Sequence, residues 1–425
     1  MRKTINIVFT YFFPIFMIDY YLIMRGVNLN TVVMLPIFAL LGIKAIEIAN
    51  KNNSNQFLRY VSIFLLYSLL TVVLYIFNDA PVSCYTSNFR QFVFPILFAY
   101  LGCAYSKNNE FNKWYLIACA FCFVLGFYLY ATAPSYYVNY LHEAQSNWWF
   151  AEERDYVNET NILEFSRFSS FFTSSYIICF FSIPALILSL AYSLDEKRPL
   201  GKPWCYAIAV VSFIAAIICL QRIAIAFSIV IVSFYGLFAG RISGGRNWST
   251  TWLAYVVIIF AAVVVFGQIA HLDWFDRIAE HVGGRIEVLN FTQAMSDRMG
   301  QYESFDRATS FSYIFGLGLG SCGHAAGAAG LKAIYDGEFV KLFYEFGIVG
   351  CVLFALPILS TLRRGLKSFN DYHAEVFITL FYLAAGVGAD SLTFFVYSAM
   401  FWFAMGRIWN KDYAIFKHFK SIQKT

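Results

Sequence analysis

Three ionisable side chains in the second half of the chain could exchange protons with a substrate. His324 follows a run of glycines, and Asp336 and Glu338 come just before a long apolar stretch. A carboxylate at the edge of a membrane is partly desolvated, which raises its pKa and suits it to act as a general base. Capping of the helix expected after Asp336 is the structural alternative for that residue. We rank Asp336 first as a catalytic base, then Glu338 or His324.

Arginines form the second group of candidate residues, because a planar guanidinium binds phosphate oxygens through paired hydrogen bonds. Arg167 and Arg222 each stand at the end of an apolar run. An arginine is costly there unless something anionic meets it. A lipid headgroup or a diphosphate is the expected ligand of Arg222, and a side chain that reaches the membrane surface is the alternative.

Composition indicates the class of protein that must position these residues. Apolar residues make up 59% of the 425 residues and charged residues only 13%, and the mean hydropathy is +0.59. Soluble domains are nearer 25% charged. Apolar runs of spanning length recur along the whole chain, which predicts an all-α, polytopic membrane protein with a single membrane domain over 1–425. Met1-Arg2-Lys3 and the apolar run after it are expected to form an uncleaved first span, since no small-residue cleavage site follows.

We expect about twelve membrane spans. Their approximate ranges are 6–24, 29–47, 57–77, 88–105, 115–133, 171–193, 204–220, 223–239, 251–267, 338–359, 374–389 and 391–406. With the N-terminus inside, 20 of the 31 basic residues fall in inward segments, and every inward segment has at least two. The positive-inside rule therefore predicts that both termini are cytoplasmic.

The basic residues expected on the outer side are mostly arginines. There are nine arginines and two lysines, against eight and twelve inside. These eleven residues are Arg25, Arg90, Arg154, Arg167, Arg222, Arg277, Arg285, Arg298, Arg307, Lys332 and Lys341. Chance in a small sample is one explanation, and an outward-facing anion site is the other.

Two long outward loops are expected, at 134–170 and 268–337. Long loops in compact proteins are usually functional. The first is rich in aromatics, among them Tyr140, Trp148 and Trp149. These rings either form an interfacial belt or stack on sugar rings. The second loop begins with a segment typical of an amphipathic surface helix, over 271–310, and continues with a glycine-rich segment over 311–330.

Other chemistries are disfavoured by the pattern. No His, Cys, Asp or Glu spacing suggests a metal cage, so neither a metal nor a cofactor is expected. Gly318-x-Gly320-x-x-Gly323 matches a dinucleotide fingerprint. It lacks the strand–turn–helix context, so we do not assign nucleotide binding. The net charge of +5 is concentrated on the inner face, which fits anionic lipid rather than nucleic acid.

Several segments together resemble one family. Ser166-Arg167-Phe168-Ser169-Ser170-Phe171 resembles an entry to a span, and Gln221-Arg222-Ile223-Ala224 resembles a hairpin between spans. Phe315-Gly316-Leu317-Gly318-Leu319-Gly320 is followed by Tyr344-Glu345-Phe346-Gly347-Ile348-Val349-Gly350. In order and spacing over about 130–360, these segments are similar to the superfamily of O-antigen polymerases (Wzy-type) and O-antigen ligases.

The resemblance implies a membrane-embedded, GT-C-like glycosyltransferase of lipopolysaccharide biosynthesis in the bacterial inner membrane. It would act on undecaprenyl-pyrophosphate-linked oligosaccharides at the periplasmic face, without metal. Arg167 and Arg222 would match arginines that bind the pyrophosphate, and Arg298 would match an arginine of the large loop. A chain-length regulator protein is a further partner that the resemblance implies.

Asp336-Gly337 stands at the position where the ligases of this superfamily look to carry a His-Asn pair. This difference favours a polymerase of repeat units over a ligase that transfers polysaccharide to lipid A-core. A flippase or transporter of lipid-linked sugars is the alternative outside this family. It predicts charged residues within several spans, for which Asp19 and Asp390 are the main candidates in the sequence.

Overall fold

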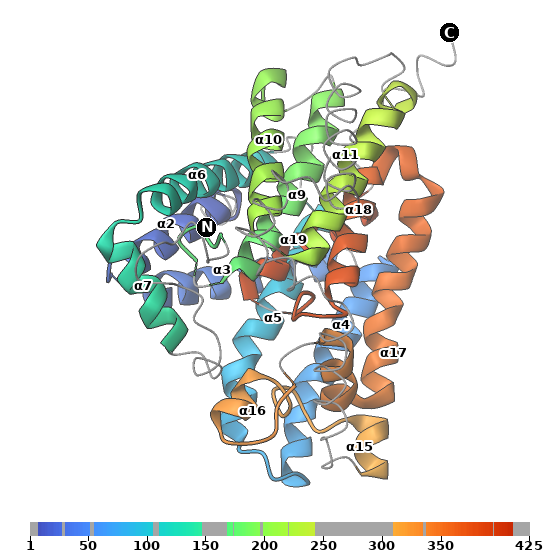
Figure 1. Cartoon of the computed structure of the whole chain (residues 1–425). Coiled ribbons are helices and arrows are strands. Elements are labelled where there is room, and N and C mark those ends of the chain that lie inside the picture. The colour runs from blue at the N-terminus through green and yellow to red at the C-terminus, as the bar shows by residue number, and fades with distance from the viewer. Residues whose placement is uncertain are drawn as a thin grey trace, which may run out of the picture. The chain divides into compact units, whose positions relative to one another are not determined.

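The computed structural model describes most of the helical chain in two compact units (Figure 1). The residues described are 7–27, 30–51, 55–104, 110–146, 168–172, 174–195, 199–219, 221–242, 309–334, 337–393 and 395–410. Within these ranges the regular elements are all helices. One unit comprises Met1–Ile37, Asn108–Asn290 and Ile415–Thr425, and we call it unit 1. The other comprises Phe38–Lys107 and Phe291–Ala414, and we call it unit 2.

Unit 1 is organised around one buried helix. Its described helices are α2 (Phe12–Met24), α6 (Glu110–Thr132), α7 (Ser135–Ser146), α9 (Ser175–Leu194), α10 (Lys202–Ile218) and α11 (Arg222–Ile242). The α9 helix is apolar on all sides, as expected of a helix in the centre of a bundle. It is buried from Ile177 to Leu194 and packs against α6, α10 and α11.

A short non-helical segment of unit 1 is held by hydrogen bonds to its backbone. Tyr137 Oη donates to the Ser170 carbonyl at 2.8 Å, and Tyr140 Oη donates to the Phe171 carbonyl at 3.2 Å. The Ser170 hydroxyl donates to the Cys122 carbonyl at 2.7 Å. Because these bonds replace helical ones, the helix expected from 171 begins at Ser175, with Ser174 accepting a capping bond from Tyr176 N.

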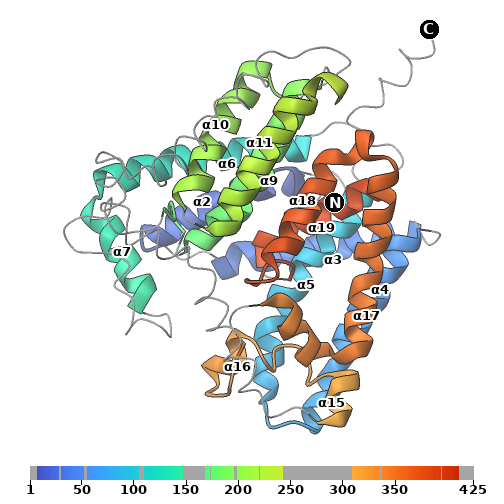
Figure 2. The same cartoon turned by 45° about the vertical axis from the view of Figure 1, so that its right-hand side comes forward.

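Unit 2 contains the second set of helices (Figure 2). These are α4 (Gln56–Leu70), the 3₁₀ helix η1 (Thr71–Ile76), α5 (Val82–Ala104), α15 (Ser310–Phe315), α16 (His324–Ala328), α17 (Glu338–Lys367), α18 (Phe369–Ala385), the 3₁₀ helix η3 (Phe395–Ser398) and α19 (Ala399–Trp409). The α3 helix (Asn30–Lys51) runs from unit 1 into unit 2. The α5 and α19 helices cross closely, because Gly102 and Gly406 lie against each other's helix backbone.

One end of unit 2, which we call the basic end, is built around Trp409. Its indole stacks on Phe57 at a centroid distance of 5.9 Å and donates to Thr361 Oγ1 at 2.9 Å. The Arg364 guanidinium lies over the same ring, 4.7 Å from its centroid. The C-terminal ends of α17 and α19 therefore meet the start of α4. Arg363, Arg364, Lys367 and Arg407 lie on these helix ends.

The opposite end of unit 2 contains the glycine-rich segment, with α15 and α16 beside the first turns of α5 and α17 (Figures 1 and 2). This segment fills a break in α17 at Gly347, whose φ of 63° and ψ of −171° are non-helical. The Tyr344 carbonyl accepts from Leu317 N at 2.8 Å, and the Glu345 carbonyl accepts from Gly318 N at 2.9 Å. The Phe346 carbonyl accepts from Tyr67 Oη at 2.9 Å. The two glycine motifs of the sequence therefore contact each other directly.

A second irregular stretch separates α18 from α19. The sequence predicted two spans, 374–389 and 391–406, divided by one residue; the structure instead has turns and η3 between Ala385 and Ala399. Trp402 Nε1 donates to the Leu392 carbonyl at 2.6 Å, and Tyr382 Oη donates to the Tyr397 carbonyl at 2.6 Å. Backbone that leaves the helix needs such partners wherever water is excluded.

Five described helices are long and apolar enough to cross a membrane. They cover Val33–Lys51, Gln56–Ile76, Glu110–Thr132, Ser175–Leu194 and Glu338–Lys367. Three shorter apolar helices, Phe12–Met24, Lys202–Ile218 and Arg222–Phe238, coincide with further predicted spans. These helices support the prediction of a helical membrane protein. The span expected at 251–267 and the amphipathic helix expected in 271–310 lie outside the described residues, and the count of twelve stays a prediction.

We expect Gly347→Ala to destabilise the protein. A Cβ at this position would lie 2.4 Å from the Ile314 carbonyl oxygen, on a backbone that only glycine adopts without strain. The cost is about 2 kcal/mol or more, and it would appear as a lower thermal unfolding midpoint of the detergent-purified protein. Gly42→Ala is the matched control, because a Cβ there meets nothing within 4 Å. Equal midpoints for the two variants would contradict the role of the break.

Candidate functional site

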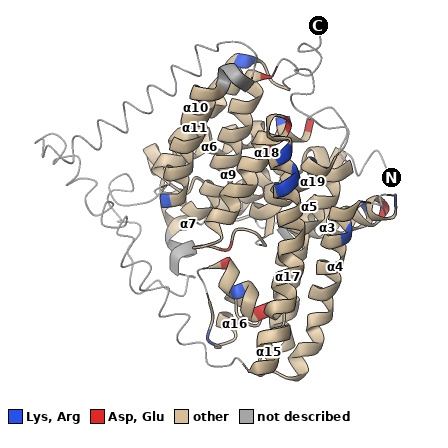
Figure 3. Ribbon diagram, turned by 90° about the vertical axis from the view of Figure 1, so that its right-hand side faces the viewer, with Lys and Arg blue, Asp and Glu red and all other residues tan. Residues whose placement is uncertain are grey.

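A cluster of charged side chains lies at the start of α17, at the end of unit 2 opposite the basic end (Figure 3). Glu338 and Lys341 are the first charged residues of the helix, and both are buried. Lys341 Nζ lies 3.6 Å from Glu338 Oε1 and 2.8 Å from Asp390 Oδ2. Lys341 therefore lies between a carboxylate of its own helix and one from the irregular stretch after α18.

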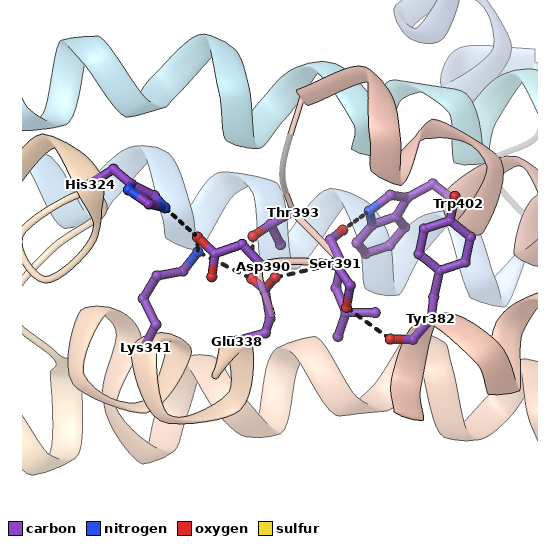
Figure 4. Close-up of polar contacts among 9 residues, drawn as sticks. His324, Glu338, Lys341, Tyr382, Asp390, Ser391, Thr393 and Trp402 are labelled. Carbon is purple, nitrogen blue, oxygen red and sulfur yellow. Dashed lines mark hydrogen bonds and ion pairs between the residues drawn. The ribbon is translucent and has the colours of Figure 1, made fainter. Parts of the chain in front are cut away.

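Glu338 fastens these two parts of the chain together (Figure 4). Its Oε2 accepts from Leu392 N at 3.0 Å, and its Oε1 accepts from the Thr393 hydroxyl. Its own backbone N–H donates to the Gly386 carbonyl at 2.9 Å. With an exposed fraction of 0% for its side chain and both oxygens bonded, Glu338 is placed to hold the fold rather than to take a proton from a substrate.

His324 is the exposed member of the cluster. Its side chain is 48% exposed, and its Nε2 lies 3.8 Å from Asp390 Oδ2 (Figure 4). Asp390 is 9% exposed and faces both His324 and Lys341 through the same oxygen. Its Oδ1 has no hydrogen-bond partner among the residues described. The arrangement is an accessible imidazole backed by a carboxylate, which in turn is held by a lysine.

Two adjoining spaces open beside His324. The inner one, of about 10 Å³, is lined by Lys341, Glu345 and Asp390 and has room for about one water molecule. The outer one, of about 430 Å³, is lined by the first turns of α5 and by α16. His324 and Gln91 line both spaces. A group bound in the outer space would therefore lie next to the imidazole.

Three residues of this cluster were not among the site residues predicted from the sequence. Lys341, Glu345 and Asp390 all line the inner space. Glu338, Lys341 and Glu345 are spaced by three and four residues, which places them on one face of a helix. Three charges on one face of an otherwise apolar run were a signal in the sequence. Asp390 carried no comparable signal, because its proximity depends on the turn between α18 and α19.

The other site residues predicted from the sequence belong to unit 1 or lie outside the described residues. Asp336, Arg167, Arg298, Trp148 and Trp149 lie outside the described residues. Arg222 begins α11 in unit 1 and is half-buried. Tyr140, also in unit 1, uses its hydroxyl on the Phe171 carbonyl, and burial raises the pKa of that hydroxyl. The described residues therefore bring together Glu338 and His324 only.

Metal ligation and disulfides have no counterpart in the described part of the chain. Across these residues no three His, Cys, Asp or Glu side chains are grouped to hold a metal ion. All nine cysteines are free thiols, and Cys84 and Cys322 are both buried. The chemistry available at the cluster is proton exchange and hydrogen bonding.

Comparison with known proteins leaves the family open. No protein-family model matches the chain, and no curated protein matches it significantly.

We expect Lys341→Met to destabilise unit 2, because it leaves Glu338 and Asp390 buried without their cation. Removing one partner of a buried ion pair costs about 3–5 kcal/mol. The thermal midpoint of the purified protein measures the loss. The double variant Lys341→Met with Glu338→Gln removes one of the two carboxylates left without a cation. It should therefore recover part of the lost stability. A double variant less stable than the single one would contradict the pairing.

Proposed function

We propose that this protein is a membrane glycosyltransferase that polymerises lipid-linked oligosaccharide repeat units, an O-antigen or surface-polysaccharide polymerase. One observation carries the proposal: a half-exposed histidine, backed by a carboxylate, borders a cavity at the end of unit 2 away from the basic end. By the positive-inside rule the basic end would face the cytoplasm and the cavity the periplasm. The resemblance implies that lipid-linked repeat units are joined on that side.

His324 is our choice of general base. Histidine exchanges protons near neutral pH, and a carboxylate beside it stabilises the imidazolium that forms. Asp390 supplies that carboxylate. This choice moves His324 ahead of Glu338, whose oxygens are bonded to Leu392 and Thr393. Asp336 remains an alternative base from the sequence.

The proposed reaction is a substitution at the anomeric carbon. A hydroxyl of the acceptor repeat attacks that carbon, and its proton passes to the His324 imidazole. The bond from the carbon to the phosphate oxygen breaks, and its electron pair leaves with undecaprenyl pyrophosphate. The imidazolium then releases the proton to water. Each turnover lengthens the chain by one repeat unit.

The leaving diphosphate needs cations that the cluster does not provide. Glu345 and Asp390 line the inner space together with Lys341, whose ammonium is paired with Asp390, so this space does not favour an anion. We therefore assign the diphosphate to arginines, with Arg222 first and then Arg167 and Arg298, as the resemblance implies. Each charge-assisted hydrogen bond contributes about 1.5–3 kcal/mol.

A transporter of lipid-linked sugars is a second candidate, and buried ionisable side chains favour it. Asp19, Glu338, Lys341, Glu345 and Arg407 are all at most 7% exposed. Charged residues inside a membrane bundle often mark ion or proton pathways. In the polymerase proposal, the buried charged side chains of the cluster instead hold the general base His324 and the break in α17 in position.

His324→Gln should abolish polymerisation while leaving the protein folded, because glutamine keeps a hydrogen-bonding amide but cannot take the proton. General base catalysis contributes about 10²–10⁴-fold in rate. The assay uses purified protein with synthetic lipid-pyrophosphate repeats and follows chain growth. No reaction by the unaltered protein would support the transporter, and transfer only to lipid A-core would support a ligase. Unchanged growth with His324→Gln would exclude His324 as the base.

Arg222→Ala should eliminate long-chain polysaccharide in a polymer-deficient strain that expresses the variant. The reason is the loss of a charge that stabilises the leaving diphosphate. Gel electrophoresis of the surface polysaccharide shows the ladder of chain lengths. An unchanged ladder would contradict the assignment of Arg222 to the diphosphate. Detection of the variant in the membrane fraction controls for its expression.

A further inference from the structure

The outer cavity beside His324 has a polar wall and a small-residue wall. Ser83, Ser87 and Gln91 recur at intervals of four residues on α5, so they share one face of that helix. Ala325 and Ala328 of α16 form the other side. The Cys84 thiol contacts the Ala325 carbonyl at 3.5 Å, which fixes one wall against the other.

The polar groups of this wall are available for a ligand. Among the residues described, the Gln91 carboxamide and the Ser87 hydroxyl make no hydrogen bond. Asn88 donates its amide nitrogen to the Cys84 carbonyl at 3.1 Å, and it also lines the cavity. Neutral amide and hydroxyl groups donate and accept, as sugar hydroxyls do. The volume of about 430 Å³ lies within the range of about 300–1,000 Å³ usual for small-ligand sites.

The charges around the cavity favour a neutral ligand. Among the described residues that line the cavity, His324 is the one ionisable side chain apart from the Cys84 thiol. Through Gln91 the cavity adjoins the inner space with Asp390 and Glu345. Among the described residues that line this inner space, the one cation is Lys341, which is paired with Asp390 at 2.8 Å. A carboxylate bound here would face like charges, which disfavours binding.

We propose that this cavity is the acceptor subsite and that it binds an uncharged sugar residue, a hexose, deoxyhexose or N-acetylhexosamine, and rejects uronic and other acidic sugars. The assignment rests on the proposed polymerase function. Ser87, Asn88 and Gln91 bind the ring hydroxyls. The hydroxyl to be glycosylated points at His324, and the alanine wall allows the ring to approach closely.

The experiment measures sugar binding separately from catalysis. Saturation-transfer NMR on the full-length protein in detergent uses methyl glycosides of glucose, rhamnose and N-acetylglucosamine as neutral probes and of glucuronic acid as the acidic probe. We expect at least one neutral probe to bind and the acidic probe to bind at least tenfold more weakly. No neutral binding, or equal binding of the acidic probe, overturns the proposal.

Two variants locate the binding. Ser87→Trp fills the cavity and should weaken neutral-sugar binding at least tenfold. Thr86→Trp is the matched control, since Thr86 is exposed on the same turn of α5 but does not line the cavity. Gln91→Leu keeps the volume, removes the amide and should weaken binding severalfold. Unchanged binding in both Ser87→Trp and Gln91→Leu overturns the proposal.

The chain-growth assay separates this proposal from the polymerase proposal. Neutral-sugar binding that Ser87→Trp abolishes, without any chain growth by the unaltered protein, would keep the neutral-sugar site in this cavity and overturn the polymerase together with the acceptor role. Chain growth with the same KM for the acceptor in Ser87→Trp would keep the polymerase and overturn the subsite.

Discussion

A peptide group that water cannot reach must find its hydrogen-bond partner inside the protein. Unit 2 leaves the helical pattern at Gly347 and again between Ala385 and Ala399. Each break is closed by hydrogen bonds from groups that lie outside it. Leu317 N, Gly318 N and Tyr67 Oη serve the first, and side chains such as Trp402 serve the second. The positions of α15, α16 and the charged cluster all follow from these closures.

The charged cluster obeys the same constraint. A buried carboxylate is tolerated when it is paired and hydrogen-bonded. Glu338 meets this condition with an ion pair to Lys341 and bonds from the second break. Asp390 is thereby brought from that break to the side of His324. The residues that carry the proposed chemistry are therefore positioned by the same ion pair and hydrogen bonds that provide partners for buried polar groups of unit 2.

The sequence allowed much of the helical framework to be predicted, because long apolar runs are typical of membrane-spanning helices. Such runs at 57–77 and 115–133 agree with α4 with η1 and with α6 to within several residues. The span predicted at 391–406 is wrong at its start, since hydropathy cannot distinguish a buried turn from a buried helix. The glycine motifs were visible in the sequence, but their contact with each other depends on a break in φ and ψ at Gly347. The proximity of His324 and Asp390 likewise depends on tertiary packing.

The long reach of the Glu338 contacts has a consequence for biogenesis. The carboxylate belongs to the first turn of α17, whereas its partners Leu392 and Thr393 are 54 and 55 residues further on. They leave the ribosome only after α17 and α18 have been made. During synthesis the Glu338 carboxylate in the first turn of α17 therefore lacks these two partners until residues 392 and 393 have been made. The cluster is therefore completed late in synthesis, so a chain that ends before residue 390 lacks the carboxylate that lies beside His324 and Lys341.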